Sequence, residues 1–420
     1  MADHLTTRRA TRWRVTPDPV TDILGVLTIC VYGSWYYGYG VIIDDVGEEL
    51  GLGAAALGAA FGVAQLLVGV LSTVAGRLLD RYGPHMVLGV IGPIGAITLG
   101  FAGRAGHGWL FVALFAIGGG VTGATGFYHL TQAVLVRLSS PASATDGDPA
   151  LRRIIRLTIW GALASPIAIP LTEAIRHVAG WRLAIELPAG AAAVAFLVSS
   201  RVIRRVPRAE PSPVLPLRDV IARAVHDPVL IRFIAAAFLS MAAVSTLLVF
   251  QVSIMRWAGL SAAAAAGFAG ARGLFQLMGR LPLRRALDHV GSWHLLGGAR
   301  VMVAVACVML LISGTAWPAV AYVVLAGTSI GALSALDGIV ARDVVDTADI
   351  GTMMGVISLA AAAGAAVAPV LAGQLTDATG APVAAACTAA GCALASAMVL
   401  AGAYRRRTRA ATAATGTVPE

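Results

Sequence analysis

Two arginines inside one apolar stretch are the residues of this sequence best suited to bind a charged molecule. Arg272 and Arg280 lie eight residues apart in the stretch 262–286, with Gln276 halfway between them. A charge within an apolar stretch is costly and usually faces a partner or a pathway. A guanidinium keeps its charge and offers a planar fork that matches a carboxylate. Arg272 has no acidic residue within four positions, so its partner is either another segment or a bound anion.

Aromatic residues gather in the first apolar stretch. Five of them fall between residues 32 and 39, which is too many for one face of a helix. Some must point toward a cavity or a neighbouring helix, because buried tyrosine hydroxyls need partners. Tyr36 and Tyr37 are the candidates for lining a binding site. An aromatic belt at a membrane interface explains part of the cluster equally well.

Three titratable residues are candidates for coupling to protons. Such coupling needs a group whose pKa differs between the two faces of a membrane. His129 is the only histidine well inside an apolar stretch, and Glu173 and Asp337 lie near the ends of two others. The alternatives stay open: a histidine satisfied within the core, and carboxylates that are solvated or cap a helix.

A short charged hairpin occurs twice in the sequence. Residues 76–85 read GRLLDRYGPH between two apolar stretches, and a degraded copy, RRALDHVG, follows about 208 residues later at 284–291. An aspartate at a helix end can accept backbone N–H groups from a neighbouring helix and complement its dipole. We expect the hairpins to act in gating, the alternative being a solvated loop. The candidate gating residues are Gly76, Asp80, Arg81, Gly83, Arg284 and Asp288, with Arg137 and Arg342, which close two further apolar stretches.

Composition excludes an ordinary soluble enzyme. Hydrophobic residues make up 58% of the 420 residues and charged residues only 13%, and the mean hydropathy is +0.80. Soluble proteins have about 25% charged residues. The long apolar runs lack the alternation of a barrel strand, so they predict membrane-spanning helices of about 20 residues. The four cysteines have no metal or redox spacing. We expect no metal, no cofactor and no enzymatic activity.

The apolar runs predict an all-α membrane protein with twelve spans in two pseudo-symmetric sets of six. The expected divisions are a tail at 1–19, a six-helix bundle at 20–200, a linker at 201–228, a second bundle at 229–404 and a tail at 405–420. The expected spans lie near 20–43, 53–79, 86–103, 109–136, 154–177, 183–200, 229–253, 262–286, 293–314, 317–341, 352–375 and 381–404.

The arginines predict the orientation of the chain in the membrane. With the N-terminus in the cytoplasm, the cytoplasmic segments collect 23 arginines and the outer loops four. This asymmetry follows the positive-inside rule and places both termini in the cytoplasm. The net charge of +9 is therefore explained by topology, and we expect no nucleic-acid partner. The chain contains neither Lys nor Asn, which is typical of a GC-rich bacterial genome and favours a bacterial inner (plasma) membrane.

The repeated hairpin and the two sets of six spans resemble the major facilitator superfamily. Three stretches resemble its monocarboxylate and oxalate/formate branch: YYGYGV at 36–41, DRYGP at 80–84 and PVLAGQLTDATG at 369–380. The resemblance implies the major facilitator fold and a site between the halves. It also implies that Asp80 and Asp288 latch the halves on the cytoplasmic side. In this register Arg280 would contact a substrate carboxylate, or serve only in gating or packing.

The resemblance implies a secondary active transporter that works by alternating access as a monomer. The leading hypothesis is proton-linked symport of a small organic monoanion resembling a monocarboxylate, with protons and the lipid bilayer as its other partners. Residues 352–368 contain no Lys or Arg, unlike oxalate-type members, which favours a monoanion over a dicarboxylate. A proton-coupled exporter of amphipathic drugs or metabolites is the main alternative, and a membrane sensor that does not transport is a third.

Overall fold

The chain folds into helices throughout the part that the structure describes. The computed structural model describes residues 18–138, 149–203, 222, 226–344 and 350–415. The N-terminal set of helices comprises α1 (Pro19–Val31), η1 (Tyr32–Tyr37), α2 (Tyr39–Leu50), α3 (Ala54–Tyr82), α4 (Pro84–Met86), η2 (Val87–Ile91), α5 (Gly92–Ala102), α6 (Gly108–Gly126), α7 (Tyr128–Leu138), α8 (Pro149–Ala162) and α9 (Ala164–Val202). The C-terminal set comprises α11 (Leu230–Trp257), α12 (Ala262–Arg280), α13 (Leu283–Val290), α14 (Ser292–Leu311), α15 (Ala316–Val344), α16 (Ile350–Thr379) and α17 (Val383–Thr415).

Ten stretches of helix within the described residues are long and apolar enough to cross a membrane. One of them, Arg156–Val202, contains Gly180 at φ 79° and ψ 169°, where the chain turns, so this stretch supplies two passes. The 19-residue helix α12 is not among the ten, because Arg272 and Gln276 lower its mean hydropathy. With that turn and α12 counted, the described helices account for the twelve expected spans, and the predicted all-α fold is confirmed.

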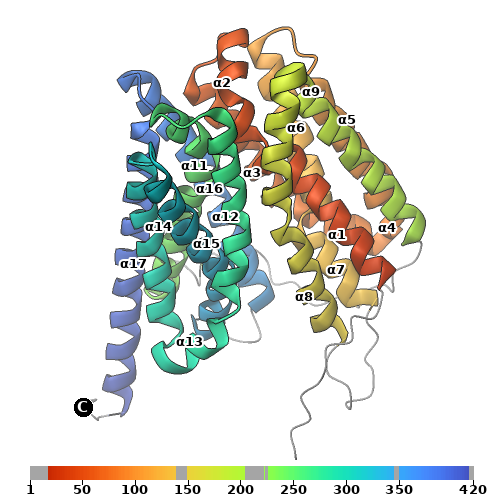
Figure 1. Ribbon diagram of the computed structural model, residues 1–420. Coiled ribbons are helices and arrows are strands. Elements are labelled where there is room, and N and C mark those ends of the chain that lie inside the picture. The colour runs from red at the N-terminus through yellow and green to blue at the C-terminus, as the bar shows by residue number, and fades with distance from the viewer. Residues whose placement is uncertain (1–17, 139–148, 204–221, 223–225, 345–349, 416–420) are drawn as a thin grey trace, which may run out of the picture.

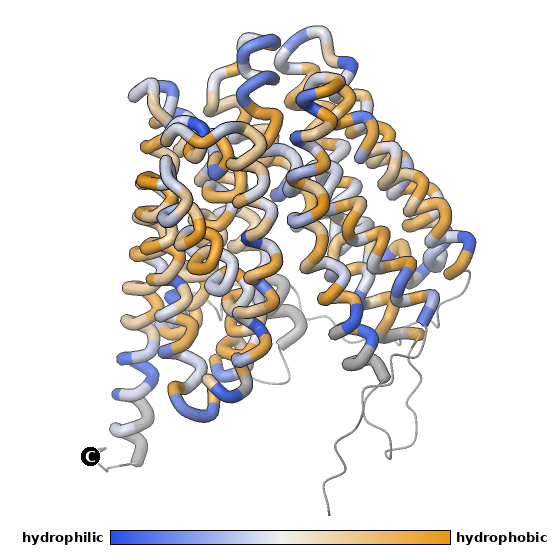
Figure 2. Tube along the Cα trace, viewed as in Figure 1, coloured by the Kyte–Doolittle hydropathy of each residue, from blue (hydrophilic) through white to orange (hydrophobic). Residues whose placement is uncertain are grey.

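The outer surfaces of the helices are apolar over most of their length. Figure 2 shows hydrophobic residues along the helices and hydrophilic residues gathered toward their ends. Large apolar side chains such as Ile94, Phe101 and Met398 are more than half exposed. In water this much apolar surface would favour aggregation, whereas lipid tails solvate it without cost. The surface is that of a multi-pass membrane protein.

The hairpin repeat is visible in the backbone. Gly83 ends α3 at φ 77°, and Gly291 ends α13 at φ 82°. Only glycine adopts this region without strain, so both copies need glycine at this point. Each glycine lets the chain reverse between two consecutive helices. Figure 1 shows the two sets side by side, with the N-terminal set in red to yellow and the C-terminal set in green to blue.

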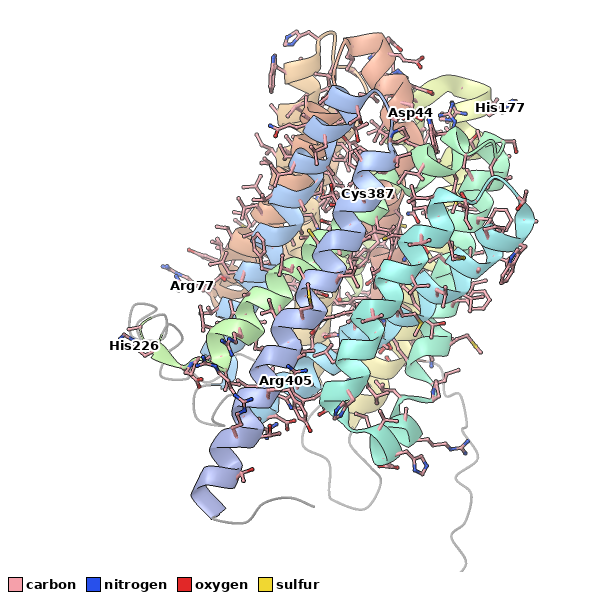
Figure 3. All side chains as sticks on the ribbon, turned by 90° about the vertical axis from the view of Figure 1, so that its left-hand side faces the viewer. Asp44, Arg77, His177, His226, Cys387 and Arg405 are labelled. Carbon is pink, nitrogen blue, oxygen red and sulfur yellow. The ribbon has the colours of Figure 1, made fainter. Side chains whose placement is uncertain are left out.

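Small residues bring the two sets into contact at one end of the molecule. A Cβ added to Gly58 would lie 2.3 Å from the carbonyl oxygen of Pro369, and one added to Gly62 would lie 2.2 Å from that of Ala366. The backbones of α3 and α16 therefore touch along this stretch, as small residues permit in membranes. We call the end of the molecule that carries Asp44 and His177 the closed end (Figure 3).

The sets diverge toward the opposite end, where Figure 3 places Arg77, His226 and Arg405 and where α17 ends. We call it the termini end. A Cβ on Gly69 would still lie 2.9 Å from the side chain of Ala362. Two turns further along α3, a Cβ on Gly76 would meet no atom of the described residues within 4 Å. Contact between the two helices is therefore lost toward the termini end.

Candidate functional site

A polar stripe runs along α12 in the middle of the molecule. Arg272, Gln276 and Arg280 follow one another at intervals of four residues, so they share one face of the helix. Arg272 is fully buried, Gln276 is 8% exposed and Arg280 is half-buried. Two small residues of α12, Gly270 and Gly273, pack against α9. This close packing fixes the position of α12, and with it the stripe, relative to the N-terminal set.

The guanidinium of Arg272 is held at one nitrogen only. Its Nε donates to the side-chain oxygen of Gln251 at 3.3 Å, and the Tyr322 hydroxyl donates to the same oxygen at 2.6 Å. The Nη1 and Nη2 atoms of Arg272 have no hydrogen-bond partner among the described residues. A buried and unpaired cation is strongly unfavourable. The geometry therefore leaves an oriented pair of N–H donors that an anion would satisfy.

The tyrosines of the first span lie in a wider turn of that span. Residues Tyr32–Tyr37 form the π-helix η1, whose turn is wider than that of the surrounding α-helix. π-bulges of this kind are frequent at functional sites. Tyr32 lies 5.4 Å from Tyr36 and 5.8 Å from Tyr37 between ring centroids, so all three rings gather on one side. Trp35 is fully buried and meets Tyr36 edge to face at 5.7 Å.

Two further aromatic residues complete what we call the aromatic wall, defined as Tyr32, Tyr36, Tyr37, Phe127 and Tyr128. Helices α6 and α7 meet at Phe127, whose backbone is extended at φ −75° and ψ 169°. The Phe127 ring stacks on Tyr32, with centroids 3.9 Å apart and an interplanar angle of 7°. Tyr36 and Tyr37 pack against the hydrophobic cores of both sets of helices.

The polar stripe and the aromatic wall meet across the two sets. Arg272 interacts electrostatically with Tyr36, and Arg280 interacts with the side chain of Tyr128. Arg280 Nε also donates to the carbonyl oxygen of Gly331 at 3.4 Å. Of the two arginines, Arg280 is thus the better satisfied. The structure brings together five sequence-predicted site residues: Arg272, Gln276, Arg280, Tyr36 and Tyr37.

The closed end is held by ionic contacts between the sets. Asp44 of α2 accepts hydrogen bonds from Ser253 and from Arg256 of α11, at 2.8 and 2.7 Å. The Asp377 carboxylate near the end of α16 accepts from the backbone N–H groups of Ala54 and Ala55, at 2.7 and 3.0 Å. These N–H groups open α3, where a negative charge complements the helix dipole. Together the two contacts fasten the N-terminal to the C-terminal set.

Glu173, a candidate for proton coupling, is engaged at the same end. Its carboxylate lies 2.7 Å from Nε of Arg176, whose Nη1 lies 2.8 Å from Asp45. Glu173 is buried and shares the Arg176 guanidinium with Asp45. This arrangement is typical of a fixed ion pair that tethers α9 to α2.

Asp337 has a different environment. Its carboxylate lies 2.9 Å from Nη2 of Arg300 on α14, and the two side chains are 34% and 1% exposed. Arg300 Nη1 also donates to the carbonyl oxygen of Ser396 at 3.5 Å, while its Nε has no partner among the described residues. Asp337 therefore combines access to solvent with a partner charge in the interior of the protein.

The structure does not describe the side chains of several predicted gating and coupling residues. The side chains of Asp80, His129, Arg137, Arg284 and Arg342 are outside the residues that the structure describes. Asp288 is exposed, and Arg81 is exposed and lies over the ring of Tyr82 at 5.2 Å. The predicted gating role of the hairpins stays a prediction.

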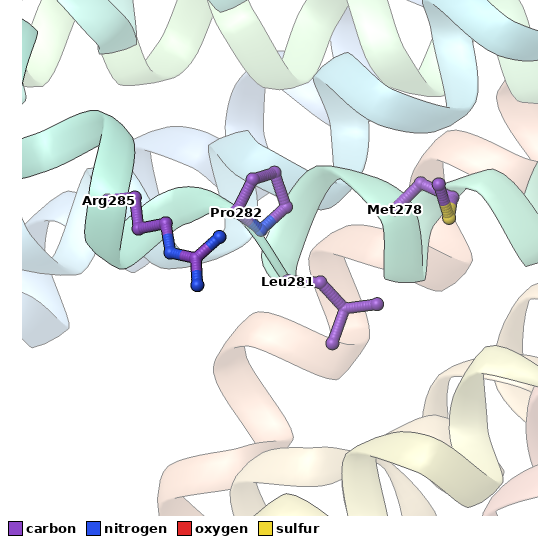
Figure 4. Close-up of a pocket in the computed structure, with 4 residues that line it drawn as sticks. All are labelled: Met278, Leu281, Pro282 and Arg285. Carbon is purple, nitrogen blue, oxygen red and sulfur yellow. The ribbon is translucent and has the colours of Figure 1, made fainter.

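An open surface pocket adjoins the Arg280 end of the polar stripe. It is lined by Met278, Leu281, Pro282 and Arg285 at the junction of α12 and α13 (Figure 4). Met278, Leu281, Pro282 and Arg285 are all exposed side chains. The pocket lies beyond Arg280 and does not include the partnerless nitrogens of Arg272, so we do not assign the binding site to it.

Sequence reasoning missed four residues of this arrangement. Gln251, Tyr322 and Arg256 act through contacts between helices, which local spacing does not reveal. Arg300 is a charge inside an apolar stretch, so the rule that singled out Arg272 would also have found it.

The fold and site define a multi-pass helical membrane transporter. Residues 24–336 match the family model of the Major Facilitator Superfamily, and the chain belongs to that family. Membership makes the chain a transporter of small molecules rather than an enzyme. No curated protein matches its sequence.

Solved structures of several transporters share this fold. A point mutant of the nucleoside transporter NupG has a TM-score of 0.79 at 14% identity, covering 92% of this chain and 99% of that one. The POT family transporter PepTSo has a TM-score of 0.71 at 14% identity, covering 94% and 99%. A bacterial homolog of the human lysosomal transporter Spinster, solved in an inward-facing and occupied conformation, has a TM-score of 0.68 at 14% identity, covering 92% and 96%. At these identities the likeness shows the fold alone.

Proposed function

We propose that this protein is a secondary active transporter that carries a small organic monoanion, resembling a monocarboxylate, by proton-linked alternating access. The observation that carries the proposal is the fully buried guanidinium of Arg272 with both Nη atoms free among the described residues. A carboxylate accepts two parallel N–H bonds from such a fork and cancels its charge. One free cation favours an anion with a single charge.

Alternating access would use the two ends of the molecule in turn. The positive-inside asymmetry supports a cytoplasmic termini end, which makes the closed end the outer one. Asp44, Arg256 and Asp377 then form the outer gate, and the loss of contact near Gly76 corresponds to opening toward the cytoplasm. The hairpin residues Asp80 and Asp288 are the corresponding proposal for the inner gate.

Asp337 is the proposed proton carrier. Its carboxylate is partly exposed and pairs with the buried Arg300, so protonation would remove one charge of the pair and free the other. A charge change at this point alters which arrangement of α14 and α15 is stable. Glu173 is less suited, because two hydrogen bonds from Arg176 stabilise its ionised form.

Uptake into proteoliposomes tests the proposal. Wild-type protein should accumulate a labelled monocarboxylate when the outside is made acidic, and Arg272→Gln should abolish this uptake. Arg406→Gln, an exposed arginine on the last turns of α17, is the matched control and should transport normally. If no acid is taken up by folded wild-type protein, the anion proposal is wrong and an exporter of apolar molecules takes its place.

A further inference from the structure

We infer that the anion carried by this protein bears a flat aromatic ring, which packs against the aromatic wall while its carboxylate binds Arg272. The inference rests on the proposed function and narrows its substrate class. Two features of the site support it: the Nη edge of Arg272, which has no partner among the described residues, and the aromatic rings near Arg272.

The contacts of Arg272 determine where the anion would sit. The Gln251 side-chain oxygen accepts hydrogen bonds from Arg272 Nε and from the Tyr322 hydroxyl. The Nε side of the guanidinium is therefore occupied. The Nη1 and Nη2 edge has no partner among the described residues. Tyr36 is within electrostatic reach of Arg272. A carboxylate bound to the fork would therefore place the rest of its molecule beside η1.

The surface beside η1 consists of aromatic rings. Tyr36 and Tyr37 meet edge to face at 5.0 Å and 82°, and Tyr36 meets Tyr32 in the same manner at 5.4 Å and 88°. Tyr32, Tyr36 and Tyr37 are only partly buried, so each keeps some accessible surface. Aromatic rings prefer such edge-to-face or offset contacts with another ring. A flat ring can join this arrangement without displacing it.

Ring contacts within the aromatic wall and with Trp35 keep the wall rigid. The rings of Phe127 and Trp35 stack at 5.5 Å and 11°, and Trp35 also contacts Phe115 edge to face at 6.2 Å. The Phe127 ring supports Tyr32 from the other side at 3.9 Å. Rings packed in this way present a rigid surface of ring edges and faces, unlike the adaptable surface of methionine side chains. Such a surface offers edge-to-face contacts that a flat aromatic ring can make and a puckered saturated ring of equal size cannot.

Binding of matched pairs of acids to the purified full-length protein tests the inference. Each pair has the same charge and chain length: benzoate against cyclohexanecarboxylate, phenylacetate against cyclohexylacetate, and 3-phenylpropionate against 3-cyclohexylpropionate. We expect at least one aromatic acid to bind about tenfold more tightly than its puckered partner. Benzamide, which keeps the ring and lacks the charge, should bind more weakly than benzoate.

Two variants separate the ring from the anion. Tyr36→Leu should reduce the preference for the aromatic member of each pair to about twofold while both acids still bind, and Tyr36→Phe should retain the preference. Arg272→Gln should weaken both members together. Thermal unfolding of each variant without ligand checks that it is folded, and Tyr36→Phe provides the conservative rescue.

Three other outcomes would each contradict the ring inference or the anion proposal. Equal binding of the aromatic and puckered acids would overturn the ring inference and leave the anion proposal standing. Binding of benzamide as tight as that of benzoate would overturn the anion proposal. Absence of binding by all six acids to folded wild-type protein would overturn the ring inference, and the uptake of smaller monocarboxylates would then decide the anion proposal.

Discussion

The guanidinium of Arg256 lies 2.7 Å from the Asp44 carboxylate and joins α11 to α2 across the two sets of helices. Both side chains are about one-third exposed, at 35% and 36%. Such pairs contribute about 0.2–1 kcal/mol. A contact of this strength can open during a transport cycle, yet it is large enough to alter the balance between two states.

Asp44→Asn should shift the protein toward the state in which the closed end is open, by up to about fivefold, since 1.4 kcal/mol corresponds to tenfold. Labelling of single cysteines placed near Asp44 measures this shift. Arg104→Gln is the control, because it removes the Arg104–Glu186 pair, at 2.5 Å, inside the N-terminal set. Equal labelling of Asp44→Asn and wild type would show that Asp44 does not contribute to the gate.

Asp377→Ala should open the same end by leaving the N–H groups of Ala54 and Ala55 without their acceptor. Loss of a helix cap costs about 1 kcal/mol. Asp227→Ala is the matched control, because Asp227 caps α11 through Val229 within its own set. Both variants should lower the melting temperature, but only Asp377→Ala should raise cysteine labelling at the closed end. Similar labelling in the two variants would mean that Asp377 only caps α3 and does not hold the closed end shut.

Gly62→Ala should prevent the close approach of α3 and α16. The added Cβ would lie 2.2 Å from the Ala366 carbonyl oxygen, and overpacking of this kind costs about 1–3 kcal/mol. We expect a lower melting temperature and slower transport. Gly190→Ala is the control, because a Cβ at that glycine meets nothing within 4 Å. Wild-type behaviour of Gly62→Ala would mean that the two helices can separate there without loss.

Asp337→Asn should abolish the response of uptake to a pH gradient and leave exchange of substrate across the membrane intact. The reason is that an amide cannot take up the proton, while it can still accept a hydrogen bond from Arg300. Asp343→Asn is the control: this exposed aspartate pairs with Arg407 at 3.4 Å near the end of α15. A gradient response that survives in Asp337→Asn would assign coupling to another residue.

The sequence predicted the spans and the polar stripe because both depend on short-range patterns. Arg272, Gln276 and Arg280 share a face by their spacing alone. The sequence could not show that Gln251 would leave the Arg272 fork free, because that contact joins α11 to α12. It also could not show the π-helix η1, since one wider turn leaves the apolar composition unchanged.

The closed-end contacts were missed for a different reason. Asp377 appeared only within the stretch 369–380 that resembles a family motif. Its partners, the N–H groups of Ala54 and Ala55, are of a kind found at every helix start. Which end of the molecule is closed depends on the state of the protein, and a sequence that must allow both states does not specify one.

The most direct test of the account is the binding of a monocarboxylate to purified wild-type protein and to Arg272→Gln, with Arg406→Gln as the control. A hydrogen-bonded charge contributes about 1.5–3 kcal/mol, so we expect affinity to fall by roughly 10- to 150-fold in Arg272→Gln and to remain unchanged in Arg406→Gln. Unchanged affinity in a folded Arg272→Gln protein would contradict the assignment of Arg272 as the anion contact.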